Sequence, residues 1–218
     1  MDQAAASTGD SRERILRAAL ELMAEYGYSG TSISMIRQRS GLPASSTYWH
    51  FGSKEGLLLA VVEDGARRWM ASLPRWTDLE GEPRERLRAL MMAAADTMAN
   101  NPEPLRLLLL LSLERRHMDA QSQETIRHVR RSAANGFRLA FREIFSATSS
   151  PELLKASDDL AEFALAVTDG ACIAHLIDPT TDLVRMFGQL TTAFTLIGDT
   201  ICNLQVVGDN AGSSSSLI

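Results

Sequence analysis

Cysteines, signal-like segments and long apolar runs are all scarce in this chain. Its 218 residues include only two cysteines, Cys172 and Cys202, which we expect to be reduced thiols that pack as small core residues. The leucine run at 107–111 has only five residues, so we expect no membrane span. The first ten residues carry no basic segment ahead of an apolar stretch. We therefore expect no secretory signal and a cytoplasmic location.

Enzymatic motifs are also missing. The sequence has no glycine-rich phosphate loop, nucleophile elbow or pair of catalytic acids, so we expect neither an enzyme nor a bound cofactor. Glu114 and His117 have the Glu-x-x-His spacing of metal-binding helical bundles, but such sites need a second motif and two further carboxylates. Glu124 and His128 have the wrong spacing. We therefore expect no metal, and a helical-bundle enzyme or metal-binding protein is the alternative interpretation.

Apolar residues recur at helical spacing through most of the chain, and neither strand-like alternation nor an internal repeat is found. The predicted fold class is therefore all-α. The predicted helices span 11–26, 54–72, 84–100, 104–116, 120–145, 151–177 and 182–204, besides two short ones described next. Residues 1–10 and the Gly- and Ser-rich tail, 208–218, are expected to be disordered.

Two short helices are predicted between Ser32 and Gly52. Ser32 is a suitable N-cap for the first helix, and Gly41 ends it. Pro43 tolerates a first helical turn and so allows the second helix to begin. Gly52 ends that helix, and Ser53 caps the long helix that follows. Two short helices joined by a tight, glycine-containing turn form a helix-turn-helix.

The second short helix has a surface suited to DNA. At about 100° per residue, Thr47 and Phe51 share one side of the helix. The other side and its flanks carry hydroxyl, indole and imidazole groups, on Ser45, Ser46, Tyr48, Trp49 and His50. Such groups bind phosphate oxygens and base edges. The alternative is a helical hairpin with aromatic residues in its core. We accept that alternative for Phe51 but not for Trp49, because one helix cannot bury both faces in so small a domain.

The helix-turn-helix is basic within an acidic chain. Residues 30–54 contain no Asp or Glu, and their charge is +3 in a chain of net charge −5. The three cations are Arg37, Arg39 and Lys54. A phosphate backbone requires such a local positive field. The preceding helix adds Arg12, Arg14 and Arg17, which form either a solvated face or further contacts to the DNA backbone.

These residues closely resemble the DNA-binding domain of TetR-family transcriptional regulators. The similarity runs from about Arg12 to Trp69 and is carried by Thr31-Ser32, Gly41-Leu42 and the run YWHFGSKE at 48–55. It implies phosphate contacts by Thr31, Tyr48, His50 and Lys54, and base-facing positions for Ser34, Ala44, Ser45 and Ser46. Ser32 and Trp49 complete the candidate DNA-binding set. Arg37 and Thr47 depart from the family pattern, which has a small residue and a leucine at these positions.

The resemblance also implies a domain organisation and a function. A helix-turn-helix domain would span 11–52, a connecting helix 53–76, and a helical domain for ligand binding and dimerisation 77–207. The implied protein is a ligand-responsive homodimeric regulator of transcription. We expect a repressor that a small, largely apolar molecule releases from a palindromic operator.

Methionine, leucine and aromatic residues in the C-terminal half favour an apolar, adaptable pocket. The candidate ligand-binding residues are Trp69, Met92, Leu109, Phe137, Phe141, Phe163 and Asp169. Ordinary core packing is the other interpretation of each apolar member. Asp169 is included because burial of a carboxylate costs free energy unless it is paired or faces a cavity or interface. His175 is expected to be a hydrogen-bonded core residue rather than a ligand-binding one.

The last two predicted helices are unusually apolar and contain small residues that allow close helix approach. The candidate interface residues are Gly170, Ala174 and Gly188. Two such helices from each of two chains would form a four-helix interface, as the family resemblance implies. Packing within a single chain is the alternative.

Overall fold

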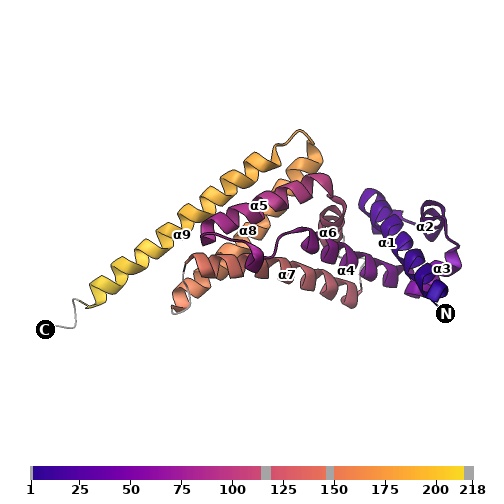
Figure 1. Cartoon of the computed structure of the whole chain (residues 1–218), viewed down its shortest axis with the longest axis horizontal. Helices are drawn as coiled ribbons and strands as arrows, with labels where there is room; N and C mark the ends of the chain where they lie inside the picture. Colours follow the sequence, from indigo (N-terminus) through magenta and orange to yellow (C-terminus); the bar gives the residue numbers. More distant parts are fainter. Residues whose placement is uncertain (1, 114–118, 146–149, 214–218) are drawn as a thin grey trace. The chain divides into compact units, whose positions relative to one another are not determined.

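The computed structural model describes residues 2–113, 119–145 and 150–213, and it describes side chains within 10–201 of these ranges. All regular secondary structure in these ranges is helical, which confirms the predicted all-α class (Figure 1). In chain order the helices are α1 (Asp2–Gly30), α2 (Ile33–Ser40), α3 (Ala44–Phe51), α4 (Lys54–Ser72), the 3-10 helix η1 (Trp76–Asp78), α5 (Pro83–Asn100), α6 (Glu103–Leu113), α7 (Ala120–Ile144), α8 (Pro151–Ile177) and α9 (Leu183–Ser213).

Helices α1 and α9 are longer than the sequence patterns predict. α1 begins at Asp2 and α9 continues to Ser213, so helix extends into both stretches for which we expect disorder. The alanines near the start of the chain favour helix formation even though apolar residues do not recur there at helical spacing. Within α1 the predicted end at Gly27 is confirmed, because Gly27 has φ 73° and ψ 169° and interrupts the helical backbone.

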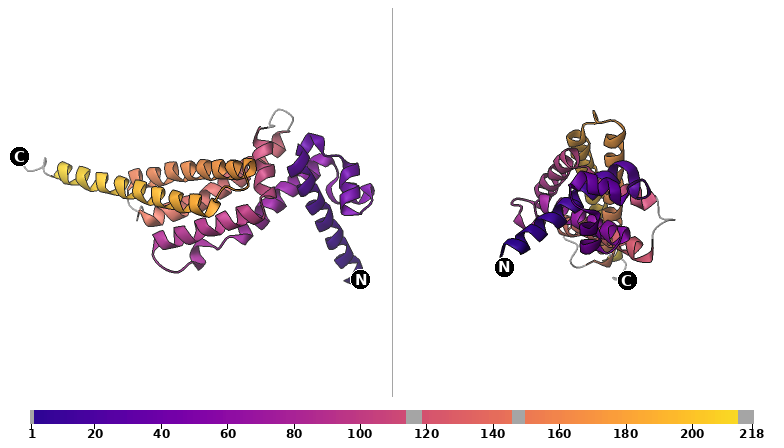
Figure 2. Two further views of the ribbon diagram at one scale, coloured as in Figure 1. Left: turned by 90° about the horizontal axis from the view of Figure 1, so that it is seen from above. Right: turned by 90° about the vertical axis from the view of Figure 1, so that its right-hand side faces the viewer.

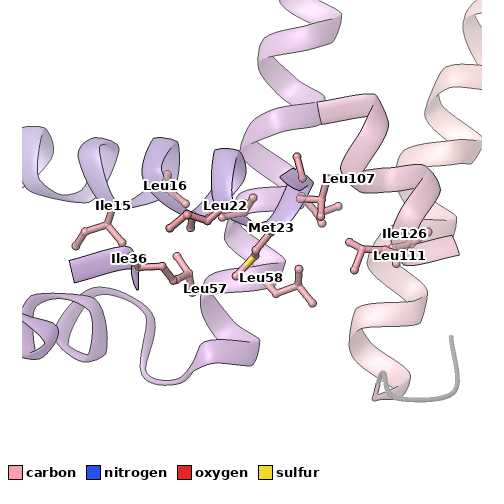
Figure 3. Close-up of a cluster of buried hydrophobic side chains, with 14 residues drawn as sticks. Ile15, Leu16, Leu22, Met23, Ile36, Leu57, Leu58, Leu107, Leu111 and Ile126 are labelled. Atoms are coloured by element: carbon pink, nitrogen blue, oxygen red, sulfur yellow. The ribbon is translucent and has the colours of Figure 1, made fainter. Parts of the chain in front are cut away.

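The first compact unit contains residues 1–72 and 100–130. Its core is an apolar cluster in which α1 contributes Ile15, Leu22 and Met23, and the shorter helices contribute Ile36 and Leu57. Figure 3 shows side chains from α6 and α7 in the same cluster. These side chains are Leu107, Leu111 and Ile126.

This unit differs from the predicted domain division, which assigns residues 77–207 to the second domain. Leu107 is 1% exposed and Leu111 is fully buried, and both pack against residues of α1 and α4. At Gly65 of α4, an added Cβ would lie 3.4 Å from the Cβ of Pro104 at the start of α6. α6 therefore belongs with the N-terminal helices because burial of its leucines requires that surface.

The second compact unit contains residues 73–99 and 131–218. Phe141 of α7 is fully buried at its centre. Its ring stacks between Phe137 and Phe145, at centroid distances of 6.2 and 5.9 Å, and Phe194 of α9 contacts it edge-on at 5.7 Å. Helices α8 and α9 lie side by side (Figure 2). An aromatic core thus joins α7 to the C-terminal pair of helices.

The segment between α4 and α5 is fixed to this second unit through Trp76. The indole Nε1 of Trp76 donates to Glu143 Oε2 at 2.5 Å, and the Arg86 guanidinium lies 4.5 Å from the centroid of the Trp76 ring. Arg86 also pairs with Glu143. The segment is therefore held to α5 and α7 by a charge-assisted contact and a cation–π contact.

Among the described residues, α8 alone is long and apolar enough to cross a membrane. Its best 18-residue window has a mean hydropathy of 1.5, although no uninterrupted apolar run in it is long. Single polar residues break up the apolar runs of this helix but lower its mean hydropathy only slightly. The length of the longest apolar run therefore does not reveal such a helix. One helix of this kind is weak evidence for a membrane, since the core helix of a soluble protein passes the same test.

The aromatic core of the second unit yields a stability prediction. Phe141→Ala removes a fully buried ring and should lower the free energy of unfolding by about 3–5 kcal/mol, because the cavity cannot collapse completely. Leu139→Ala, two residues away on the same helix but 60% exposed, should cost less than about 1 kcal/mol. Urea unfolding of both variants at one protein concentration measures the difference. Equal losses would contradict the assignment of Phe141 to the core.

Candidate nucleic-acid interface

The turn between α2 and α3 has the geometry that the sequence predicts. Ser32 has extended backbone angles, and its Oγ accepts a hydrogen bond from Met35 N at 3.2 Å, so Ser32 is the N-cap of α2. Gly41 has φ 69° and ψ 18°, and its N–H donates to Arg37 O at 3.0 Å. This left-handed conformation favours glycine and ends α2. α3 begins three residues later, which confirms the helix-turn-helix.

Helix α3 is oriented by one buried side chain and by the turn that follows it. Thr47 is 1% exposed and faces the domain interior. Gly52 has φ 75°, and its N–H donates to Tyr48 O at 2.8 Å. The Oγ of Ser53 accepts from Gly56 N at 3.0 Å and caps the start of α4. Because the C-terminal end and the inner side of α3 are fixed, its outer side is presented in a defined orientation.

The outer side of α3 carries the aromatic and hydroxyl groups. Trp49 is 71% exposed and Tyr48 is 51% exposed, so the interpretation of Trp49 as a surface residue is confirmed and the core interpretation is wrong. Phe51 is half-buried against the core cluster, as expected. His50 is half-buried beside Trp49, with 4.5 Å between ring centroids. An exposed tryptophan on an eight-residue helix contributes nothing to the core of its own domain.

The remaining candidates form two groups. Ser32, Ser34 and Ser45 are exposed, and Ala44 and Ser46 are half-buried on the same short helices. Thr31 is different, because it is 1% exposed and its Oγ1 donates to Gly27 O at 2.9 Å. Its backbone N–H donates to Tyr28 O at 3.3 Å. The predicted phosphate contact of Thr31 therefore needs correction, since both of its donors are used inside the domain and the side chain is enclosed.

The basic residues near α3 differ in how they are engaged. Arg14 donates from Nη2 to Ser40 O at 2.8 Å, and Arg39 pairs with Glu21 at 2.7 Å. In the described part of the chain, Arg37 and Lys54 form no ion pair. Lys54 instead lies over the ring of Tyr28, with Nζ 4.3 Å from the ring centroid. Positive charge that is not engaged in an ion pair therefore remains at Arg37 and Lys54, although Glu55 directly follows Lys54 in the chain.

The sequence leaves two interpretations open for the arginines of α1. The structure gives each of them a different contact. Arg14 acts within the domain, where it holds the last carbonyl of α2. Arg17 pairs with Glu13 on the same helix at 3.6 Å. Arg12 lies 5.5 Å from the centroid of the Phe51 ring, at the end of α3. Burial lowers the pKa of His50, and the nearby positive charge of Arg12 lowers it further. Neutral His50 is thus favoured near pH 7 in the free protein.

The seven ligand-binding candidates are distributed over both compact units. Trp69 and Leu109 belong to the first unit, and Met92, Phe137, Phe141, Phe163 and Asp169 belong to the second. Phe141 is a core residue, because it is completely enclosed by other rings. Phe163 is 52% exposed and contacts Phe194 edge-on. The Nε1 of Trp69 is buried without a hydrogen-bond partner among the described residues, whereas Asp169 does have a partner.

Two of the three interface candidates, Gly170 and Gly188, lie at open positions. A Cβ added at Gly170 of α8 or at Gly188 of α9 would meet no atom within 4 Å, whereas one at Gly198 would collide with the ring of Phe145. Ala174 is half-buried. Large apolar side chains are exposed along the same two helices, at Phe163, Ile173, Ile177, Val184 and Leu196. Of these three glycines, packing within the chain therefore explains the lack of a side chain only at Gly198.

No described group of three or more His, Cys, Asp or Glu residues is arranged to hold a metal ion. The Glu114 and His117 pair lies outside the described residues. Cys172 is buried with a free thiol, as expected, and burial raises its pKa to about 11. The side chain of Cys202 is not among those described. His175 is half-buried with an Nδ1 that lacks a partner, so the expected core hydrogen bond is not found for that atom.

Sequence reasoning missed Tyr28, which the fold brings to this surface, and it left two interpretations open for Arg12. Arg12 reaches the end of α3, and Tyr28 reaches the start of α4. Tyr28 is separated from Lys54 by 26 positions in the chain, so no local pattern could relate them. The only available signal was the position of Tyr28 directly after the helix-ending Gly27.

Comparison with known proteins identifies this geometry. Residues 15–61 match the family model described as bacterial regulatory proteins, tetR family, and this range includes α2, α3 and the start of α4. The N-terminal region of the chain is therefore similar to that of tetR-family regulators. The similarity rests on this region, because the family model covers only that part.

Curated relatives also match this chain over a short stretch of about the same length. The HTH-type transcriptional regulator LmrA of Bacillus subtilis is 48% identical over 59 residues, which are 27% of this chain and 31% of LmrA. The HTH-type transcriptional repressor AcnR of Corynebacterium efficiens is 36% identical over 66 residues, which are 28% of this chain and 35% of AcnR. The chain thus matches about a third of the length of these relatives.

Solved structures extend the likeness to the whole fold. A TetR-family regulator from Agrobacterium tumefaciens has a TM-score of 0.69 at 22% identity, over 86% of this chain and 97% of the other. The regulator FadR of Bacillus subtilis, solved with stearoyl-CoA, has a TM-score of 0.67 at 17% identity, over 84% and 97%. At such identities the likeness concerns the fold, which is an N-terminal helix-turn-helix domain followed by a C-terminal helical domain.

The turn between α2 and α3 yields a second stability prediction. Gly41→Ala should destabilise the fold by about 1–2 kcal/mol, because a side chain at φ 69° is strained. Its Cβ would also lie 3.3 Å from Arg14 Nη2. The matched control is Gly30→Ala, which lacks a positive φ and meets only ordinary contact at 3.4 Å. Thermal unfolding of both variants measures the effect, and a Gly41→Ala variant as stable as the control would show that the turn is not constrained.

Proposed function

We propose that this chain is a DNA-binding regulator of transcription that reads its site through α3. The observation that carries the proposal is the outer side of α3, where exposed Tyr48 and Trp49 lie beside hydroxyl groups and near cations that form no ion pair in the described part of the chain. A tryptophan that is 71% exposed to water stabilises nothing in its own domain. A DNA backbone and base edges would provide this side chain with contacts.

The contacts divide into two classes. Tyr48, His50 and Lys54 would hold phosphates, because phenol, imidazole and ammonium groups donate to phosphate oxygens irrespective of sequence. Ser34, Ser45 and Ser46 would face base edges, and Ala44 would contact a thymine methyl group or leave room for the groove. Arg37 is an additional exposed cation for the backbone. Because the base-facing side chains are short, specificity would come from close approach of the two short helices.

We further propose that the chain acts as a repressor and is released by a small apolar effector in the second unit. Two relatives support the proposal by their own descriptions, since AcnR is named a repressor and FadR was solved with stearoyl-CoA. An effector can act only if it binds the state that does not bind DNA more tightly than the other state. The expected lining residues are Met92 and Phe137, which are half-buried, rather than the enclosed Phe141.

The working form would be a cytoplasmic homodimer paired through α8 and α9. One eight-residue reading helix meets too few base pairs for tight specific binding, and two-fold pairing doubles the contact. Exposed Ile173, Ile177, Val184 and Leu196 would be covered in the pair, and the open space at Gly170 and Gly188 would admit the partner helices. The operator would then be palindromic, with half-sites about 34–36 Å apart or a multiple of that distance.

The DNA-binding proposal predicts a particular response to loss of Lys54. Lys54→Ala should weaken binding to all DNA sequences alike by roughly tenfold, because one phosphate contact is lost. The slope of log affinity against log salt concentration should fall by about 0.9. The probe is a duplex that the full-length chain selects from a random-sequence library, and fluorescence anisotropy measures its affinity at several salt concentrations.

A matched control separates phosphate contacts from base contacts. Ser46→Ala should change which sequences are preferred in a second selection while its salt slope stays that of the wild type. If Lys54→Ala changed neither affinity nor slope, the proposed docking of α3 would be wrong. If the wild type selected no sequence and bound DNA without salt dependence, the regulator proposal would fail and the helical-bundle enzyme would return as an alternative.

The dimer proposal predicts that one charged side chain on α8 abolishes pairing. Gly170→Arg fits the single chain without collision, because no atom lies within 4 Å of the added Cβ. In a paired structure the arginine would be buried without a partner and should separate the subunits. Light scattering should give the mass of one chain instead of two at micromolar concentration, and affinity for the selected duplex should fall by more than about a hundredfold.

The control is Gly136→Arg on α7, where an added Cβ also meets no atom within 4 Å. This variant should remain dimeric and bind as the wild type does. Circular dichroism at low temperature should give both variants the same helix content as the wild type. A dimeric Gly170→Arg protein with normal affinity would place the interface elsewhere, and a monomeric wild type that binds tightly would refute pairing.

A further inference from the structure

The start of α4 contains an electrostatic conflict. Lys54, the proposed phosphate ligand, is followed directly by Glu55, which is exposed in the first turn of the helix. A carboxylate at that position favours the helix dipole. It would also repel a nearby phosphate and attract the Lys54 ammonium away from one. Some feature of the domain must therefore keep these neighbouring charges apart if Lys54 is to bind DNA.

Tyr28 contacts both residues from the end of α1. Its Oη donates a hydrogen bond to Glu55 Oε1 at 2.9 Å, and its ring lies below the Lys54 ammonium, with Nζ 4.3 Å from the centroid. Tyr28 is itself half-buried and packs against the core cluster of the first unit. One rigidly held side chain thus engages the carboxylate through its hydroxyl and the ammonium through its face.

The local backbone explains how Tyr28 reaches this position. Gly27 has φ 73° and ψ 169°, which interrupts α1 one residue before Tyr28. The hydroxyl of Thr31 holds the carbonyl of Gly27 at 2.9 Å and keeps the irregular turn closed. The buried Thr31 therefore supports Tyr28 instead of contacting DNA.

The surroundings set the charge states of all three groups. Hydrogen bonds from its own backbone, from Tyr28 and from Ser53 lower the pKa of Glu55, so this carboxylate is charged at neutral pH. Burial and the hydrogen bond to Glu55 raise the pKa of Tyr28, which keeps its hydroxyl protonated as a donor. Burial lowers the pKa of Lys54, so its ammonium is partly removed from water and gains from the ring below it.

We propose that Tyr28 is a positioning residue for DNA binding, whose ring holds the Lys54 ammonium in place and whose hydroxyl occupies the competing carboxylate of Glu55. The inference rests on the proposed function, because it concerns the same phosphate contact. A cation–π contact uses the ring face and leaves the three N–H donors of the ammonium available, so a phosphate can be bound without loss of the ring. Lys54 is thereby ordered before DNA arrives.

The test uses the full-length chain and the duplex that the wild type selects from a random-sequence library. Tyr28→Phe keeps the ring and the packing but releases Glu55, and it should weaken binding roughly two- to fivefold. Adding Glu55→Gln to Tyr28→Phe should restore wild-type affinity, because no carboxylate is left to compete for Lys54. Tyr28→Leu removes the ring as well, so Glu55→Gln should restore its affinity only in part.

Two controls distinguish positioning from a purely structural role. In a Lys54→Ala background, Tyr28→Phe should have no further effect on affinity, since there is no ammonium to position. Thermal unfolding should give the double variant Tyr28→Phe, Glu55→Gln a midpoint no higher than that of Tyr28→Phe, because the favourable charge at the start of α4 is lost. Only the double variant should nevertheless bind as the wild type does.

Three outcomes would overturn the inference while the proposed function stands. Tyr28→Phe could bind as the wild type does, or lose affinity equally in the Lys54→Ala background, or fail to be restored by Glu55→Gln. Each would occur with a wild type that still binds the selected duplex in a salt-dependent manner. A wild type that binds no duplex would instead refute the proposed function, and the inference with it.

Discussion

The N-terminal part of this protein depends on the fact that α2 and α3 are too short to be stable alone. Each has eight residues, and isolated helices of that length are not stable in water. They persist because Ile36 and Thr47 are buried, because Ser32 caps the start of α2, and because glycines with positive φ end both helices. Every other property of the surface follows from this dependence, since the buried side of each helix determines which side is left outside.

The same dependence explains how the exposed surface acquires its chemistry. With Thr47 directed inward, Tyr48 and Trp49 face outward, so aromatic groups that stabilise other domains are available for a partner here. Cations whose mutual repulsion would weaken the fold each contact a different partner. Arg14 holds the last carbonyl of α2, Arg39 is neutralised by Glu21, and Lys54 rests on an aromatic ring. The surface thus retains the positive charge of Lys54, because the neighbouring Glu55 carboxylate accepts a hydrogen bond from Tyr28.

The second unit follows a different principle. Rings from α7 and α9 pack around Phe141, so its interior is satisfied by aromatic contacts within one chain. α8 and α9 nevertheless leave large apolar residues exposed, and Gly170 and Gly188 face open space. The distinction between Gly198, whose space is filled by Phe145, and these two glycines separates core packing from an unfilled surface. The average hydropathy of α8 cannot make that distinction, because it counts inner and outer residues together.

Local signals were sufficient for much of the organisation. Periodicity and caps determined the helical class, the ends of α2 and α3 and the outward position of Trp49, because these depend on residues within a few positions of one another. Tertiary structure alone decided that α6 packs with the N-terminal helices, that Thr31 is enclosed and that Tyr28 meets Lys54 and Glu55. The packing of α6 and the contacts of Tyr28 depend on residues brought together from distant parts of the chain. The helical spacing of apolar residues indicates which side of a helix is apolar. Which other helix covers that side is determined only when the helices pack.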